Sequence, residues 1–108
     1  MADLTPAEEL RAAAARLREK AKVATAGPWK SYSGRVDSSR GTVAVAFDGY
    51  YDSEWIATMH PDVAEPLAVL LEEAAEFVAQ LAEHYPRLPV QPHARTLAIA
   101  RVINGTSS

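Results

Sequence analysis

The chain has 108 residues, is 48% hydrophobic and 23% charged, and carries a formal net charge of −3, which predicts one small globular domain with no general attraction to nucleic acid or acidic lipid. It has no cysteine, which excludes disulfides, thiolate metal sites and a cysteine nucleophile. No signal peptide and no membrane-length apolar run is found, so we expect a cytoplasmic protein that does not associate with membranes.

The first predicted element is a helix over residues 5–23. Thr5 is a suitable N-cap, Pro6 fits the first helical position, and Glu8 completes a capping box. An apolar stripe at helical spacing then predicts the buried side, made of Leu10, Ala14, Leu17 and Ala21. The end of the helix is basic, and Gly27-Pro28 stops the helix.

Residues 29–47 predict a β-hairpin, with strands over 29–36 and 42–47 joined by a polar connection. In the second strand Val43, Val45 and Phe47 alternate with smaller residues, so we expect them to face a helix or a second copy of the ribbon. Trp29 follows the Gly-Pro turn and is expected to anchor the core, with an exposed stacking platform as the alternative.

A short helix is predicted over 53–59, capped by Asp52 or Ser53. Trp55, Ile56 and Met59 can share one side of it, and we expect this side to hold helices onto the ribbon. His60-Pro61 ends the short helix and begins the next one, because proline fits a first helical position but disfavours helix in the residue before it.

A long leucine-rich helix is predicted over 62–84, with an irregular first part and regular helix from about Glu65, because Pro66 lacks a backbone donor. Its acidic outer face beside the basic first helix favours antiparallel packing of the two. Its apolar face is the widest in the chain, comprising Val63, Leu67, Leu70, Leu71, Ala74, Phe77, Val78 and Leu81.

A proline-rich connector leads to a C-terminal helix over 92–103, closed by Asn104-Gly105, and 104–108 is expected to be a frayed tail. Together these elements predict an α+β fold over 1–108. In this fold the long helices pack together on one face of a small antiparallel ribbon.

The sequence carries no catalytic motif, and we predict a protein that is not an enzyme and that binds no metal or cofactor. One local cluster leaves an alternative open, a small hydrolase or ligand-binding domain around Asp48, Asp52, Glu54 and His60. A second alternative is a regulatory nucleic-acid-binding protein using the basic end of the first helix with Arg95 and Arg101. We do not expect nucleic acid, because the connector is too long for a helix-turn-helix and the long helix is acidic.

Two stretches resemble a family of small actinobacterial and actinophage proteins of unknown function. The run from Ala24 to Trp29, Ala-Thr-Ala-Gly-Pro-Trp, is similar to their first signature, with alanine in place of proline at Ala26. The run from Asp52 to Pro61, Asp-Ser-Glu-Trp-Ile-Ala-Thr-Met-His-Pro, resembles their second signature. The Ead/Ea22-like phage proteins share the broad pattern more distantly. The resemblance implies a prophage or mobile-element accessory protein that acts by binding.

We therefore expect a non-enzymatic protein–protein interaction module whose partner is a host or phage protein. Its ribbon has two edges, so a homodimer could form by strand pairing. The candidate interaction surface consists of Trp29, Tyr32, Tyr50, Tyr51, Trp55 and His60.

Overall fold

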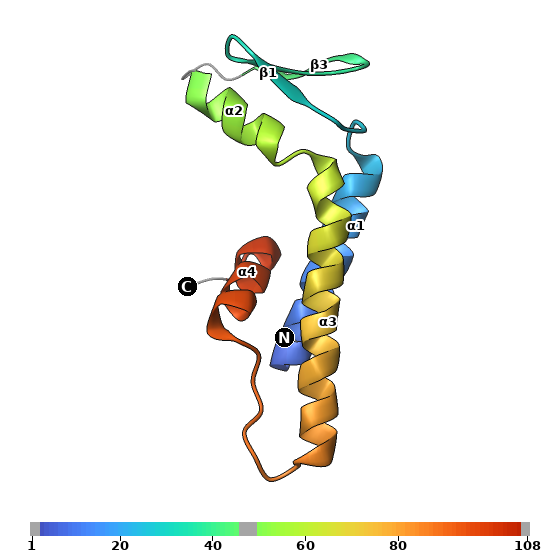
Figure 1. The fold of residues 1–108 in the computed structure, drawn as a ribbon, viewed down its shortest axis with the longest axis vertical. Coiled ribbons are helices and arrows are strands. Elements are labelled where there is room, and N and C mark those ends of the chain that lie inside the picture. Colours follow the sequence, from blue (N-terminus) through green and yellow to red (C-terminus); the bar gives the residue numbers. More distant parts are fainter. Residues whose placement is uncertain (1–2, 46–49, 107–108) are drawn as a thin grey trace. The chain divides into compact units, whose positions relative to one another are not determined.

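The computed structural model describes residues 3–45 and 50–106, and the side chain of Tyr50 lies outside this description. Within these residues the elements follow in the order α1 (Pro6–Val23), β1 (Lys30–Tyr32), β2 (Arg35–Ser38), β3 (Gly41–Val45), α2 (Tyr50–Thr58), the 3-10 helix η1 (Pro61–Val63), α3 (Ala64–His84) and α4 (Ala94–Asn104) (Figure 1). The predicted α+β class is confirmed.

The contacts of the chain group into two compact units. The helical unit comprises Met1–Glu19 and Leu67–Ser108, and the sheet unit comprises Lys20–Pro66. The single domain over 1–108 that the sequence predicts stays a prediction. Each unit is described on its own below.

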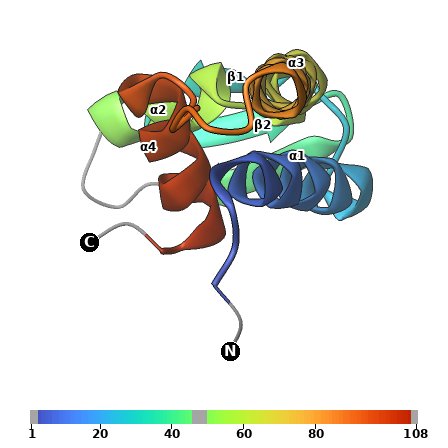
Figure 2. The same ribbon diagram turned by 90° about the horizontal axis from the view of Figure 1, so that it is seen from below.

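The helical unit is built on α1 and α3, which run side by side in opposite directions (Figure 1). Figure 2 looks along α3 and shows α1 inclined beside it, with α4 next to the first half of α1. Alanines fill much of the shared core, so the helices approach closely and little apolar area is buried per residue. The fully buried members are Leu10, Ala13, Ala14, Ala68, Leu71, Ala75 and Ala100.

Ion pairs confirm the predicted antiparallel arrangement of α1 and α3. Arg18 Nη1 lies 2.6 Å from Glu72 Oε2, and Arg11 Nη2 lies 3.7 Å from Glu76 Oε2. Arg18 follows Arg11 in α1, whereas its partner Glu72 precedes Glu76 in α3, and this order is the one that antiparallel helices require. These pairs are largely exposed, so burial of the apolar side chains contributes more stability.

Part of the predicted apolar face of the long helix is exposed in α3. Leu71 and Val78 are buried, but Leu70 and Phe77 are exposed. The apolar face is wider than the surface that α1 and α4 cover, because Leu70 and Phe77 lie about 100° or more around the helix from Leu71.

The helix ends follow their capping residues. The predicted capping box of α1 is confirmed, because Glu8 N donates to Thr5 Oγ1 (3.1 Å) and Thr5 N donates to Glu8 Oε1 (2.8 Å). The hydrogen bond from the Thr5 backbone is the main cause that lowers the pKa of Glu8. In α4 the helix begins at Ala94 rather than at 92, because His93 is the N-cap and its Nδ1 accepts from Arg95 N.

The sheet has three antiparallel strands in the order β1-β2-β3, instead of the predicted two. The predicted first strand is divided into β1 and β2 by a two-residue turn, Ser33-Gly34, in which both residues have positive φ (48° and 79°). This conformation matches the tight hairpin turns that favour glycine. Tyr32 pairs with Arg35 across this turn, so Tyr32 and Val36 point to opposite sides of the sheet.

A β-bulge changes the faces of β3. Val36 pairs with Ala44 and Asp37 pairs with Thr42, which leaves Val43 as the extra residue. The prediction that Val43 and Val45 share one face of the strand is therefore wrong, because Val45 turns outward and is exposed. Phe47, the third residue of that prediction, lies outside the described residues.

The short helix α2 packs against β1 and β2 and begins at Tyr50, three residues before the predicted start. Asp52 and Ser53 therefore lie inside the first turn and are not caps. The irregular start predicted for the long helix is confirmed, because the 3-10 turn η1 precedes α3 and Pro61 occupies its first position.

Candidate functional site

Helix α2 is unusual because it buries its small residues Ser53 and Ala57, while its large residues other than the half-buried Ile56 face outward. Its fully buried Ser53 lies against the sheet, where Ser53 Oγ and Ser31 Oγ are 2.8 Å apart, and Ala57 lies on the same side four residues later. The side that holds the helix to the sheet is therefore partly polar, and it combines two small residues with the half-buried Ile56. The prediction that Trp55 and Met59 hold helices onto the ribbon is wrong, because they lie on the opposite side.

The outward side of α2 is an aromatic and apolar surface, which we call the α2 ridge: Tyr51, Trp55 and Met59. Tyr51 is 81% exposed, Trp55 is 67% exposed and Met59 is 45% exposed. The spacing of four residues places the three side chains in one row, and Met59 N continues the helical bonding to Trp55 O (3.1 Å). Asp52 and Glu54, both exposed, lie on the two flanks of the ridge because they are about 200° apart around the helix.

The other predicted surface residues do not join the ridge. Trp29 is half-buried and its indole N–H donates to Thr25 O (3.0 Å), which ties the indole to the turn before the sheet. Tyr32 is exposed on the sheet surface that points away from α2. Tyr50 begins α2, but its side chain lies outside the described part of the chain.

His60 packs against the backbone of Gly27. A Cβ atom built on Gly27 would lie 2.5 Å from His60 Nδ1, so only glycine leaves room for the ring. His60 Nδ1 is buried and, among the described residues, has no hydrogen-bond partner; Asp62 Oδ2 is 3.6 Å away. The ring therefore fills space at the joint between α2 and η1.

The predicted carboxylate cluster is not assembled in the described residues. Asp52 and Glu54 lie on opposite flanks of α2, because helical residues two apart do not face each other. Glu54 and His60 border one open hollow of about 550 Å³, whose lining does not include Asp52. Asp48 lies outside the described residues, and the described histidines and carboxylates form no group of three that could hold a metal ion.

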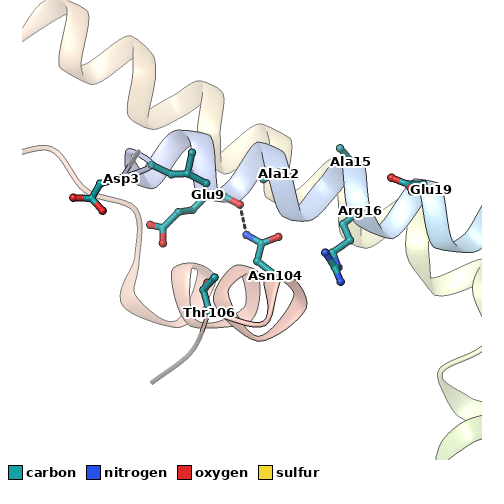
Figure 3. Close-up of a pocket in the computed structure, with 9 residues that line it drawn as sticks. Asp3, Glu9, Ala12, Ala15, Arg16, Glu19, Asn104 and Thr106 are labelled. Atoms are coloured by element: carbon teal, nitrogen blue, oxygen red, sulfur yellow. Dashed lines mark hydrogen bonds between the residues drawn. The ribbon is translucent and has the colours of Figure 1, made fainter. Parts of the chain in front are cut away.

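A second hollow, of about 640 Å³, lies in the helical unit along α1 and the end of α4. Figure 3 shows that its charged side chains are spread along its length, with Asp3 at one end and Arg16 and Glu19 toward the other. The one hydrogen bond drawn there joins Asn104 Nδ2 to Glu9 O (3.0 Å), a contact that fixes α4 to α1. These side chains do not converge on one point where a substrate atom could react.

Two of the basic residues considered for nucleic acid are engaged within the helical unit. Arg101 Nε donates to Glu9 Oε1 (3.0 Å), and this hydrogen bond raises the pKa of Arg101. Arg18 is paired with Glu72. These carboxylates offset the positive charge that would attract a phosphate to either guanidinium.

Comparison with known proteins adds no relative: no family model, curated protein or solved structure matches this chain. Within the described residues, none of the helices is long and apolar enough to cross a lipid bilayer. The site is therefore assigned from the chain's own chemistry, and among the described side chains the α2 ridge is the surface where two exposed aromatic residues lie in one row.

Proposed function

We propose that this chain is a non-enzymatic protein–protein interaction module and that the α2 ridge is its docking surface. One observation carries the proposal: α2 packs on the sheet through Ser53 and Ala57 while Tyr51 and Trp55 face solvent. Burying the aromatic side would stabilise the helix more, so its exposure has a cost that a partner would offset.

The composition of the α2 ridge supports a protein partner. Tryptophan and tyrosine are the residues most enriched among those that dominate binding energy, and methionine is enriched at interfaces. Each buried aromatic side chain removes on the order of 150–250 Å² from water, which is worth several kcal/mol before the costs of association. Asp52 and Glu54 on the flanks favour a partner surface with an apolar centre and basic borders.

The biological setting rests on the resemblance to small actinobacterial and actinophage proteins. Asp52 to Pro61, the stretch that carries the second signature, includes Trp55 and Met59 of the ridge. An accessory protein of a phage or mobile element, acting in the cytoplasm on a host or phage protein, is the role that this resemblance supports.

The proposal is tested with tagged full-length chain as bait in an actinobacterial lysate, beside Trp55→Ala and the matched control Phe77→Ala. Phe77 is an exposed aromatic residue of α3, so its loss removes a similar side chain from a different surface. We expect a protein that wild type and Phe77→Ala retain and Trp55→Ala loses. With that protein purified, calorimetry should show affinity weakened about 30-fold or more by Trp55→Ala. Equal retention by all three baits would contradict the proposal.

A further inference from the structure

The sheet unit has a second exposed surface, on the side of the sheet that α2 does not cover. Cross-strand pairs define it, because residues directly opposite each other point to the same side. Lys30 pairs with Asp37, Tyr32 pairs with Arg35, and Arg35 pairs in turn with Val45. We call this surface the sheet face: Lys30, Tyr32, Arg35, Asp37, Thr42 and Val45.

The sheet face is organised around one aromatic ring and one guanidinium. The Arg35 guanidinium carbon lies 5.3 Å from the centre of the Tyr32 ring, and Tyr32 is 66% exposed. Arg35 Nε donates to both oxygens of Asp37 (2.9 and 3.1 Å), and Thr42 Oγ1 donates to Asp37 Oδ1 (3.1 Å). These bonds lower the pKa of Asp37, first through Arg35. The stack is held in place before any partner arrives, which reduces the entropy lost on binding.

The charge of the sheet face is opposite to that of the α2 ridge. Lys30 and Arg35 lie on the sheet face and Arg40 lies in the adjoining β2–β3 turn, against the single carboxylate of Asp37. Helix α2 carries Asp52 and Glu54 and contains no lysine or arginine. Because α2 covers the inner side of the sheet, the ridge and the sheet face point away from each other and cannot meet within one copy.

We propose that the α2 ridge of one copy docks on the sheet face of a second copy. Trp55 would pack on the Tyr32–Arg35 stack through aromatic and cation–π contacts, and the flanking carboxylates would pair with Lys30 and Arg40. The inference rests on the proposed function, since it names the partner of the same ridge. It differs from the strand-edge homodimer expected from the sequence, because no strand pairing is involved.

A contact between two different surfaces is head-to-tail and has no two-fold axis. Each copy that joins still presents one ridge and one sheet face, so association continues with rising concentration and does not stop at a dimer. A single-stranded nucleic acid is the competing occupant of the sheet face, because an exposed tyrosine beside cations can stack a base. A second copy of the chain is favoured over nucleic acid as the occupant of the sheet face for two reasons. Asp37 already neutralises Arg35, and binding of nucleic acid to the sheet face would leave the acidic α2 ridge without a role.

Sedimentation of the full-length chain over a series of concentrations tests the proposal, with two variants that each disable one surface. Trp55→Ala removes the centre of the ridge and Tyr32→Ala removes the centre of the sheet face. Both positions are exposed, so the variants should keep the fold, which circular dichroism checks. Tyr85→Ala is the matched control, because Tyr85 is an exposed aromatic residue outside both surfaces.

We expect the average mass of wild type and of Tyr85→Ala to rise with concentration beyond two copies and to fall as salt is added. Each disabling variant alone should stay at the single-chain mass of 11.7 kDa. An equimolar mixture of the two variants should double that mass and go no higher, because one intact ridge then meets one intact sheet face.

Three results would overturn the inference. The first is wild type that stays monomeric throughout, which would leave the ridge free for a different protein and so would not affect the lysate test. The second is a dimer that Tyr32→Ala does not disturb, since that indicates a ridge-to-ridge contact. The third is a monomer that binds fluorescent oligothymidylate and loses this binding in Tyr32→Ala.

Discussion

Helices α2 and α3 use their large side chains in opposite ways. Helix α3 buries Leu71 and Val78 against neighbouring helices and leaves part of its wide apolar face exposed. Helix α2 buries Ser53 and Ala57 and exposes its largest residues. The difference indicates that α3 has mainly a structural role and that α2 presents a surface.

The largest expected effect tests the structural role of α3. Leu71→Ala should lower the free energy of unfolding by about 2–5 kcal/mol, because it leaves a cavity in a packed core. Leu70→Ala, one residue earlier but exposed, should change it by less than about 0.5 kcal/mol. Urea denaturation followed by circular dichroism measures both. Similar losses in the two variants would show that the core is centred elsewhere on α3.

The next effect tests how α2 is held to the sheet. Ser53→Ala should cost about 1–2 kcal/mol, because it leaves the Ser31 hydroxyl without this partner in a half-buried place. Removing both hydroxyls, in Ser31→Ala with Ser53→Ala, should recover most of that loss. If the double variant is instead as unstable as the sum of the single variants, the hydroxyl pair is not coupled.

A smaller effect is expected at the start of α1. Thr5→Ala should cost about 1 kcal/mol, whereas Thr5→Ser keeps the hydroxyl and should stay close to wild type. The folded-state pKa of Glu8 is lowered from 4.5, so its stabilising contribution is present above pH 4.5 and is lost as pH falls through the lowered value. In thermal unfolding, the difference between wild type and Glu8→Ala should therefore shrink in acid, because the bond from the Thr5 backbone needs the ionised carboxylate. A difference that stays constant down to the acid range would exclude a stabilising role of the Glu8 carboxylate.

The smallest stability effect is expected on the α2 ridge itself. Trp55→Ala should change the free energy of unfolding by less than about 0.5 kcal/mol, because the indole is mostly in water. Urea denaturation beside the Leu71→Ala sample gives the comparison directly. A loss as large as that of Leu71→Ala would make Trp55 a structural residue and would remove the basis for the docking proposal.

The sequence predicts those features that local chemistry determines. Thr5 with Glu8 predicts the capping box, and Asn104-Gly105 predicts the end of α4, where Gly105 adopts φ 72°. Opposite charges on the two long helices predict their antiparallel packing, which Arg18 and Glu72 confirm.

Features that depend on tertiary contacts or on an uncommon backbone conformation were not predictable from the residues alone. The β1–β2 turn needs positive φ at Ser33, and serine gives little signal of that conformation. In α2, spacing groups Trp55 with Met59 but does not say which side of the helix meets the sheet. The side of α2 that meets the sheet is the side on which Ser53 contacts Ser31. This contact joins residues that are far apart in the sequence, so spacing within α2 does not indicate it.

The bulge at Val43 has a consequence for insertions and deletions. Removing Val43 would leave the pairs Val36–Ala44 and Asp37–Thr42 intact and would only straighten the strand. Adding or removing a residue elsewhere in β3 while the bulge is kept would move every later side chain of the strand to the opposite surface. Length differences within this strand among natural variants should therefore concentrate at this one position.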